Sequence, residues 1–314
     1  ICGFDRKNLL KNFAVLYKLA KSQLKARRII KKFRPYAAVG VGGYASGPTL
    51  KVAGMMGIPT LIQEQNSYAG VTNKLLAKKA KKICVAYDGM EKFFEKDKII
   101  LTGNPVRQGL LNAHITKEDA VASFGLDPNK KTILIVGGSL GARTLNQCMI
   151  AGLGKIKASD VQFIWQTGKI YFEQAKTAVA KAGDLPMLYV TDFISKMENA
   201  YSAADLVISR AGAGSISEFC LLSKPVVLVP SPNVAEDHQT KNALALVEKD
   251  AALYVKDSEA NEKLLDVAME IVHKEDILKG LSANIAKLAH VDSANIIAEE
   301  VYKLAEKYKK EHGY

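Results

Sequence analysis

The chain has 314 residues, carries 44 Lys plus Arg against 32 Asp plus Glu for a formal charge of +12, and is 48% apolar. This composition excludes a disordered tail, and the length favours two domains that each bury a core. The four cysteines form no C-x-x-C pair, so neither a zinc site nor a disulfide framework is indicated and a reducing compartment fits best. No apolar run approaches the roughly 20 residues that span a bilayer. Because the chain opens with Ile1 and lacks a signal-peptide layout, we expect N-terminal residues to be missing.

The positive charge is concentrated in the first third of the chain. Residues 1–112 contain 21 basic and 6 acidic side chains, whereas the remaining 202 residues contain 23 and 26. Such asymmetry predicts a partner with negative charge, and nucleic acid, anionic lipid or a phosphorylated substrate would each fit.

Residues 6–33 show apolar positions at near-helical spacing with Lys and Arg between them, which predicts a basic amphipathic helix. One interpretation is a helix packed on a sheet with a solvated lysine face. The other is contact with an anionic membrane surface through Leu9, Phe13 and Leu16. Both can hold for different turns. Nucleic-acid binding is not predicted, because the stretch has neither interleaved aromatic residues nor a recognisable module.

Short β-branched runs that end in glycine clusters alternate with helical stretches, which is the βαβ pattern of a parallel sheet. The rhythm restarts at Lys131, so we expect an α/β chain of two doubly wound domains, residues 1–127 and 128–314, with the boundary near Pro128. A terminal helix from about Ser293 is expected to return to the first domain. Ligands of such sheets bind at the carboxyl ends of the strands, so we expect a site in a cleft between the two sheets.

Three motifs in the second half follow predicted strands. The run Gly137–Arg143 is a glycine-rich strand-to-helix turn, which suits a phosphate at a helix N-terminus but also suits an ordinary tight turn. The run Ser209–Glu218 is a second such turn, and its Glu218 can accept hydrogen bonds from ribose hydroxyls or simply favour the helix start. In the run Glu236–Ala243, Gln239 suits sugar hydroxyls, whereas Glu236 or Asp237 would cap the next helix.

The first half has three strand-end motifs of its own. They are Gly42–Pro48, Gln63–Asn66 and Gly103–Arg107. Each is expected to face the cleft, although ordinary turn chemistry explains each one separately.

Taken together, these strings resemble the MurG family, the glucosaminyltransferases that act on undecaprenyl-pyrophosphoryl-muramoyl-pentapeptide in peptidoglycan synthesis. The matching strings run in family order through nearly the whole chain: GVGGYASGP, EQNSYAGVTNKLLA, GNPVR, GGSLGARTLNQ, WQTGK, DFISKM, RAGAGSISE and DHQTKNA. The resemblance implies a glycosyltransferase-B fold at the cytoplasmic face of the bacterial inner membrane. Its first domain would hold lipid I and its second would hold UDP-GlcNAc.

The resemblance also implies roles for individual residues. In the donor site, the backbone of Ile194 would read uracil, Glu218 would hold the ribose, and Arg210 would lie near the leaving diphosphate. Ser139 and Ser215 would bind the pyrophosphate, while Ala213, Gln239 and Asn66 would lie near the sugar and Arg107 would also belong to this site. The acceptor side would include Gly42, Gly43 and Tyr44.

Two departures from the family pattern stand out. The family's N-terminal G-x-G-G-H loop, which carries its candidate general base, is not among these residues, so the catalytic base is unknown and this fragment is expected to be impaired. His238 stands where some relatives carry a second Gln, and it is not assigned as catalytic.

The predicted reaction is an inverting transfer of GlcNAc to the muramoyl 4-hydroxyl. No D-x-D motif occurs, so we expect no metal and no cofactor, with the helix N-termini after Gly138 and Gly214 and an Arg as stabilisers. Two alternatives stay open: an enzyme like UDP-GlcNAc 2-epimerase, which needs no lipid acceptor, and a non-catalytic membrane adaptor.

Overall fold

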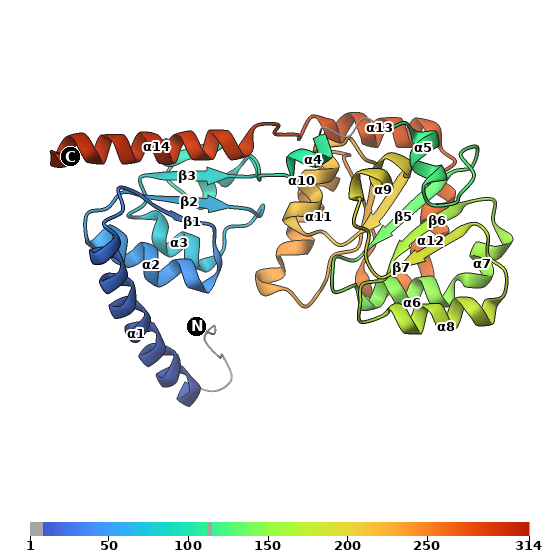
Figure 1. Cartoon of the computed structure of the whole chain (residues 1–314), viewed down its shortest axis with the longest axis horizontal. Coiled ribbons are helices and arrows are strands. Elements are labelled where there is room, and N and C mark those ends of the chain that lie inside the picture. The colour runs from blue at the N-terminus through green and yellow to red at the C-terminus, as the bar shows by residue number, and fades with distance from the viewer. Residues whose placement is uncertain (1–8, 112–114, 314) are drawn as a thin grey trace. The chain divides into compact units, whose positions relative to one another are not determined.

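The computed structural model describes the backbone of residues 9–111 and 115–313, and the side chains of residues 13–110 and 115–313. The chain forms two compact units (Figure 1). Unit 1 comprises Ile1–Pro105 with Val291–Tyr314, and unit 2 comprises Val106–His290. Each has a parallel sheet of its own, so the predicted pair of parallel α/β domains is confirmed. Within the described residues, no helix has the length and apolar character needed to cross a membrane.

Unit 1 has a four-stranded parallel sheet in the order β1-β2-β3-β4. The strands are β1 (Ala38–Gly40), β2 (Thr60–Glu64), β3 (Lys82–Val85) and β4 (Ile99–Leu101). The helices are α1 (Leu9–Phe33), α2 (Gly43–Met55), α3 (Val71–Ala77) and α14 (Ser293–His312), with short 3-10 turns η1 (Met90–Lys92) and η2 (Lys96–Lys98). Figure 1 shows α2 and α3 on one side of this sheet and α14 along the other.

The helix α1 divides into two parts. Its C-terminal turns bury Ala26 and Ile30 in a cluster with Val52 and Ala53 of α2. Its N-terminal turns expose apolar side chains instead, since Phe13 is 71% exposed and Leu16 is 49% exposed. The side chain of Leu9, the third predicted membrane contact, lies outside the described residues.

Unit 2 has a six-stranded parallel sheet in the order β10-β9-β8-β5-β6-β7. Its strands are β5 (Thr132–Val136), β6 (Gln162–Gln166), β7 (Leu188–Thr191), β8 (Leu206–Ser209), β9 (Val226–Leu228) and β10 (Leu253–Tyr254). Its helices are α4 (Gln108–Leu111), α5 (Lys117–Ala122), α6 (Arg143–Ala151), α7 (Leu153–Ala158), α8 (Phe172–Ala182), α9 (Met197–Ala203), α10 (Ala213–Leu221), α11 (His238–Val247), α12 (Ala260–Ile271) and α13 (Glu275–Ala286), with 3-10 turns η3 (Ala235–Asp237) and η4 (Asp257–Glu259).

The strand order of unit 2 reverses between β5 and β8. The chain passes from β5 outward to β6 and β7, then returns to β8 and continues the other way to β9 and β10. Such a reversal opens a crevice at the carboxyl ends of the two central strands, which is where parallel sheets bind ligands. The glycine-rich turn after β5 and the one after β8 therefore flank the same crevice.

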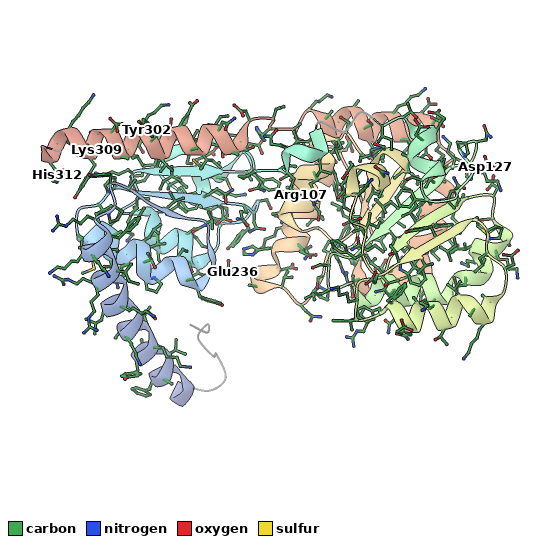
Figure 2. All side chains as sticks on the ribbon, viewed as in Figure 1. Arg107, Asp127, Glu236, Tyr302, Lys309 and His312 are labelled. Atoms are coloured by element: carbon green, nitrogen blue, oxygen red, sulfur yellow. The ribbon has the colours of Figure 1, made fainter. Side chains whose placement is uncertain are left out.

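The division between the units falls after Pro105, whereas the expected boundary was near Pro128. The intervening segment belongs to unit 2 because its side chains bond there: Lys117 Nζ lies 2.6 Å from Asp205 Oδ1, and the backbone amide of Asp127, labelled in Figure 2, donates to Gln162 Oε1 at 3.0 Å. The terminal helix α14 belongs to unit 1, where Lys309 lies over the ring of Tyr36 at 4.9 Å.

Candidate functional site

A pocket of about 370 Å³ lies at the crevice between β5 and β8 in unit 2. The loop after β5, the start of α6, the segment after β9 and the 3-10 turn η4 supply its walls. Its lining residues are Gly137, Gly141, Ala142, Arg143, Thr144, Tyr171, Arg210, Ser231, Pro232, Asn233, Gln239 and Asp257. The predicted residues Arg210 and Gln239 therefore meet in one pocket with the first glycine-rich turn.

Close backbone approach shapes that turn. Gly141 has a φ of 81° and lies against the loop after β6, so that a Cβ at this position would come within 2.1 Å of the carbonyl oxygen of Thr167. A Cβ on Gly168, in the loop after β6, would come within 2.2 Å of the backbone nitrogen of Gly141. Only glycine fits both places. The exposed tip of the loop carries Ser139, which does not line the pocket.

Arg210 is held at one end of its guanidinium. Nη1 donates to the carbonyl oxygens of Val229 at 2.9 Å and Pro230 at 3.3 Å, and it also bonds Asp257 Oδ1. The other carboxylate oxygen of Asp257 accepts from Thr144 Oγ1 at 3.0 Å. This arrangement fixes the guanidinium plane while its Nη2 and Nε donors are not used by these bonds, so a planar cation is presented to the pocket.

Gln239 is oriented by the backbone. Its Oε1 accepts from the amide of Ser231 at 2.9 Å, so its Nε2 group is the end left to donate to a ligand. The sequence allowed either end to be used. Gln239 follows two non-glycine residues with positive φ, Glu236 at 55° and Asp237 at 53°.

The expected helix cap in this segment is wrong in its detail. Asp237 does occupy the N-cap position of α11, but its side chain makes no cap bond to the backbone. Its carboxylate instead accepts from Thr240 Oγ1 at 2.7 Å. His238 Nε2 lies 3.6 Å from Glu236 Oε2, and neither residue is among those that line the pocket.

Glu218 lies within α10 and is bonded on both oxygens. Oε2 accepts from the hydroxyl of Tyr201 at 2.6 Å, and Oε1 lies 3.3 Å from Arg107 Nη2. Tyr201 is buried, whereas Arg107, labelled in Figure 2, is exposed. Burial, together with the charge of Glu218, raises the pKa of Tyr201, so the phenol stays a donor. The structure therefore joins the predicted residues Glu218 and Arg107.

The second glycine-rich turn leads into α10 earlier than expected. The helix begins at Ala213 with Gly212 at its N-cap, so Gly214 and Ser215 already lie in the first turn and the helix does not start after Gly214. No side chain caps this end. The first amides of an uncapped helix suit an anion, although Ala213, Gly214 and Ser215 do not line the pocket described above.

Ile194 is tied to the first glycine-rich turn through one glutamine. Its backbone amide donates to Gln166 Oε1 at 3.3 Å, and Gln166 Nε2 donates to the carbonyl oxygen of Gly138 at 3.2 Å. The side chain of Ile194 is buried, while the adjacent Phe193 is 52% exposed. Gln166 therefore fixes the backbone at Ile194 relative to the Gly138 turn.

In unit 1, the strand-end motifs meet around Glu64. This buried carboxylate accepts from the backbone amide of Asn66 at 3.1 Å, from the amide of Gly70 at 3.0 Å and from Asn73 Nδ2 at 2.8 Å. Gln63 Nε2 also donates to Asn104 Oδ1 at 2.7 Å. These bonds hold Asn66 at the carboxyl end of β2.

The predicted acceptor-side residues begin α2. Gly42 and Gly43 have φ values of 85° and 73°, and Tyr44 follows with 55% of its surface exposed. The helix has Gly42 at its N-cap and no side-chain cap. This end of α2 and Asn66 both follow strands of the same parallel sheet, so they lie at the same edge of it.

Sequence reasoning missed three residues of the site. Asp257 holds Arg210, Thr144 holds Asp257, and Tyr201 holds Glu218. Asp257 lies in a short 3-10 turn after β10 and Tyr201 in a helix before β8, so neither occurs in a glycine-rich motif. Two signals were available: Asp257 is a polar residue just after a strand, and Thr144 directly follows the glycine-rich run Gly137–Arg143.

Comparison with known families gives two matches. The description "Glycosyltransferase family 28 C-terminal domain" fits residues 132–297, and "Glycosyltransferase family 28 N-terminal domain" fits residues 1–85. Among curated relatives, a protein of Phocaeicola vulgatus is 78% identical over 313 residues, which cover 100% of this chain and 83% of that protein. It is named UDP-N-acetylglucosamine--N-acetylmuramyl-(pentapeptide) pyrophosphoryl-undecaprenol N-acetylglucosamine transferase.

Solved structures give two further likenesses. The crystal structure of Acinetobacter baumannii MurG is similar with a TM-score of 0.74 and 31% identity, over 91% of this chain and 80% of that one. The UDP-GlcNAc 2-epimerase from Neisseria meningitidis bound to UDP-GlcNAc is similar with a TM-score of 0.67 and 14% identity, over 91% of this chain and 81% of that one. At that identity, the second likeness concerns the fold alone.

Proposed function

The chain belongs to the MurG family of glycosyltransferases, and from this membership we propose the chemistry of its site. The enzyme transfers GlcNAc from UDP-GlcNAc to lipid I, the undecaprenyl-linked muramoyl pentapeptide, and forms lipid II in peptidoglycan synthesis. The transfer is inverting: the muramoyl 4-hydroxyl attacks the anomeric carbon on the face opposite to UDP, through an oxocarbenium-like transition state.

The crevice of unit 2 holds the donor. Glu218 accepts from the ribose hydroxyls, because its carboxylate is already positioned by Tyr201. The carbonyl of Ile194 accepts from uracil, and the Nε2 group of Gln239 donates to a sugar hydroxyl, since its Oε1 is engaged by Ser231. Arg107 contributes its charge beside Glu218. Asn66 and Ala213 are proposed sugar contacts.

One arrangement supports this proposal above the others: a glycine-rich turn and the anchored Arg210 line the same pocket, and the uncapped start of α10 follows the adjacent strand β8. The turn Gly137–Ala142 and the first turn of α10, with Ser139 and Ser215, offer backbone amides to a diphosphate, and Arg210 adds a fixed positive charge. Negative charge grows on the leaving diphosphate in the transition state. Preorganised donors at that point stabilise it, so we propose that no divalent metal is required.

In unit 1, the start of α2 binds the acceptor and the N-terminal turns of α1 bind the membrane. Gly42, Gly43 and Tyr44 open α2, whose uncapped amides suit the acceptor's diphosphate. Phe13 and Leu16 are exposed on a helix rich in Lys and Arg, which suits an anionic membrane surface. We propose that the enzyme is peripheral and works at the cytoplasmic face of the bacterial inner membrane.

A direct assay tests this function. The protein is incubated with UDP-GlcNAc and a lipid I analogue in vesicles, and the product is identified by mass and by the anomeric coupling constant of its new linkage. The rate in EDTA is expected to equal the rate in Mg²⁺. A strict requirement for Mg²⁺ would contradict metal-free stabilisation, and retention of configuration would contradict direct displacement.

Binding measurements test the donor site separately. Glu218→Ala should weaken UDP binding by about 1 to 3 kcal/mol, because a ribose partner is lost. Glu173→Ala, an exposed carboxylate at the start of α8, is the matched control and should leave the affinity unchanged. Equal affinities in the two variants would remove Glu218 from the site.

Two other functions share some of these features. The epimerase fold likeness allows a reaction on UDP-GlcNAc alone, which would yield UDP-ManNAc without any acceptor. A membrane adaptor would bind vesicles but not UDP. We expect neither outcome, because Phe13 and Leu16 are of no use to an epimerase and the anchored Arg210 is of no use to an adaptor.

A further inference from the structure

A second pocket, of about 490 Å³, lies in unit 1 between three helices. It lies within the range of about 300 to 1,000 Å³ in which proteins bind small molecules. Its lining residues are Val15, Leu19, Gln23, Tyr44, Gly47, Pro48, Leu50, Lys51, Met55, Thr60, Val71, Thr72, Leu75, Leu76, Lys78 and Lys79. We call this pocket the α1–α3 groove.

Helical periodicity explains the shape of the groove. From α2, residues 44, 47, 48, 51 and 55 recur at intervals of three and four, so they form one stripe along the helix. From α1, residues 15, 19 and 23 recur at intervals of four and form a second stripe. The stripe on α2 extends over about 16 Å at about 1.5 Å per residue. The groove therefore extends along α2, with α1 as a second wall.

Apolar side chains at the groove remain exposed. Leu75 is 74% exposed, Met55 is 61% exposed and Val71 is 54% exposed. Large apolar surface that stays accessible in a folded unit indicates a ligand or a membrane that covers it. The N-terminal half of α1 forms part of the groove wall, since Val15 and Leu19 line it.

The charges around the groove select the kind of ligand. Lys51, Lys78 and Lys79 line it, and none of its described lining residues is acidic. An apolar floor with a lysine rim fits an amphiphile with an apolar chain and an anionic head.

The position of the head follows from α2. The groove begins at Tyr44 and Gly47, beside the uncapped helix start at Gly42 and Gly43. It then runs along α2 to Met55, away from that start. A diphosphate at the helix start would thus have its lipid chain directed into the groove.

We propose that the α1–α3 groove binds the isoprenoid chain of the acceptor lipid next to its diphosphate. This inference rests on the proposed function, because that function names the acceptor. The first isoprene units leave the bilayer and lie along α2, between Lys51 on one side and Leu75 on the other. The groove then sets the depth and direction in which the diphosphate and the muramoyl sugar are presented.

Farnesyl diphosphate is the probe, since it carries a short isoprenoid chain on a diphosphate and dissolves without membranes. Calorimetry on the whole chain, with saturating UDP to occupy the donor site, compares it with inorganic pyrophosphate. Farnesyl diphosphate is expected to bind at least tenfold more tightly. Equal affinities would overturn the proposal.

A groove-filling variant locates the binding. Leu75→Trp places an indole at the groove mouth and should remove most of the tenfold advantage of farnesyl diphosphate. Tyr302→Trp is the control: Tyr302, labelled in Figure 2, is 69% exposed on α14 and does not line the groove. Equal losses in both variants, or no loss in either, would overturn the proposal.

A cross-linking experiment needs no variant. A diazirine analogue of farnesyl diphosphate should label peptides from residues 15–23 and 44–79, and labelling elsewhere would contradict the groove. Dihexanoyl phosphatidylglycerol, soluble as a monomer, should compete weakly. Competition as strong as that of unlabelled farnesyl diphosphate would instead assign the groove to phospholipid.

The failure of the groove can be told apart from the failure of the function. GlcNAc transfer to a soluble acceptor that carries the muramoyl pentapeptide and the diphosphate but no isoprenoid chain depends on the proposed function but not on the groove. Absence of that transfer, together with absence of UDP binding, would refute the function. Its presence, together with equal affinities for farnesyl diphosphate and pyrophosphate, would refute the groove alone.

Discussion

Tyr201 donates its phenolic hydrogen to Glu218 Oε2 across 2.6 Å, and the pair is closed on its other side by Arg107. The tyrosine is buried and its ring packs edge-on against Phe219 at 5.9 Å between centroids. These bonds fix the rotamer of the Glu218 carboxylate before a ribose binds. The bond therefore prepares Glu218 for binding, although neither group takes part in bond breaking.

Tyr201→Phe should raise the KM for UDP-GlcNAc about 5- to 30-fold and change kcat much less. The variant loses one hydrogen bond to a charged group, which is worth about 1 to 2 kcal/mol, while the ring packing stays. Steady-state kinetics with varied donor check this. Tyr189→Phe, another ring of unit 2 in an edge-on pair, is the control and should leave KM unchanged. A fall in kcat at constant KM would contradict the positioning role.

The same bond has a pH dependence that can be measured. Because burial and Glu218 raise the pKa of Tyr201 above its ordinary value, the phenol keeps its proton as the pH rises. The ratio of the UDP affinity of the wild type to that of Tyr201→Phe should therefore stay constant between pH 8 and about 10. Titration of both proteins with UDP across this range checks the point. A wild-type affinity that falls to the variant's level by pH 10 would show that the phenol has ionised.

Asp257→Asn should lower kcat about tenfold and leave the donor KM within about threefold of the wild type. The carboxylate fixes Arg210, whose charge matters most when the leaving diphosphate becomes more negative. Removing the negative charge of Asp257 also favours ground-state binding of a diphosphate, which opposes any rise in KM. Thr144→Val, which loses only the hydroxyl bond to Asp257, should have a smaller effect in the same direction. An increase in kcat with Asp257→Asn would refute this role.

Residues in local sequence motifs could be predicted from the sequence, whereas contacts between residues far apart in the sequence could not. Strand ends with glycine-rich turns are local in sequence, so both crevice loops could be predicted from their spacing, whereas the role of Arg210 came from the family resemblance. The bond from Tyr201 to Glu218 spans 17 positions and the bond from Arg210 to Asp257 spans 47. Such pairs depend on how the strands are ordered in the sheet, and periodicity does not encode that order.

The boundary between the units shows the same limit. The turn-forming residues around Pro128 are a real turn, but a turn alone does not separate two units. The segment before this turn belongs to unit 2, because Lys117 donates a hydrogen bond to Asp205, 88 positions later. The two parts of α1 were predicted better, since an apolar stripe and a lysine face are both readable from spacing.

Phe13→Ser and Leu16→Ser should each weaken binding to anionic vesicles about 10- to 150-fold. Each removes an exposed apolar side chain whose burial is worth about 1.5 to 3 kcal/mol. Co-sedimentation with phosphatidylglycerol vesicles measures the partition. Phe33→Ser, at the other end of the same helix and 78% exposed, is the control and should bind as the wild type does. Equal losses in all three variants would mean that α1 does not contact the membrane through its N-terminal turns.

Lys224 makes the stability of unit 2 depend on pH. Desolvation lowers the pKa of this lysine from its ordinary 10.5 to about 8, against an opposing effect from Asp205. Its Nζ donates to the carbonyl oxygen of Ala204 at 3.1 Å. Between pH 8 and 10.5 the unfolded chain holds a proton that the folded chain has released, so the free energy of unfolding rises with pH. Below pH 8 the full cost of a partly buried charge is present.

Lys224→Met should therefore be more stable than the wild type at pH 7, by about 1 to 3 kcal/mol, and should lose this advantage by about pH 10. Urea unfolding followed by fluorescence measures unit 2 alone, because Trp165 is the single tryptophan of the chain and lies in its core. Lys130→Met, at an exposed position of the same unit, is the control and should show no such crossover. A constant difference between Lys224→Met and the wild type from pH 7 to pH 10 would show that Lys224 keeps its proton throughout, and the lowered pKa would be refuted.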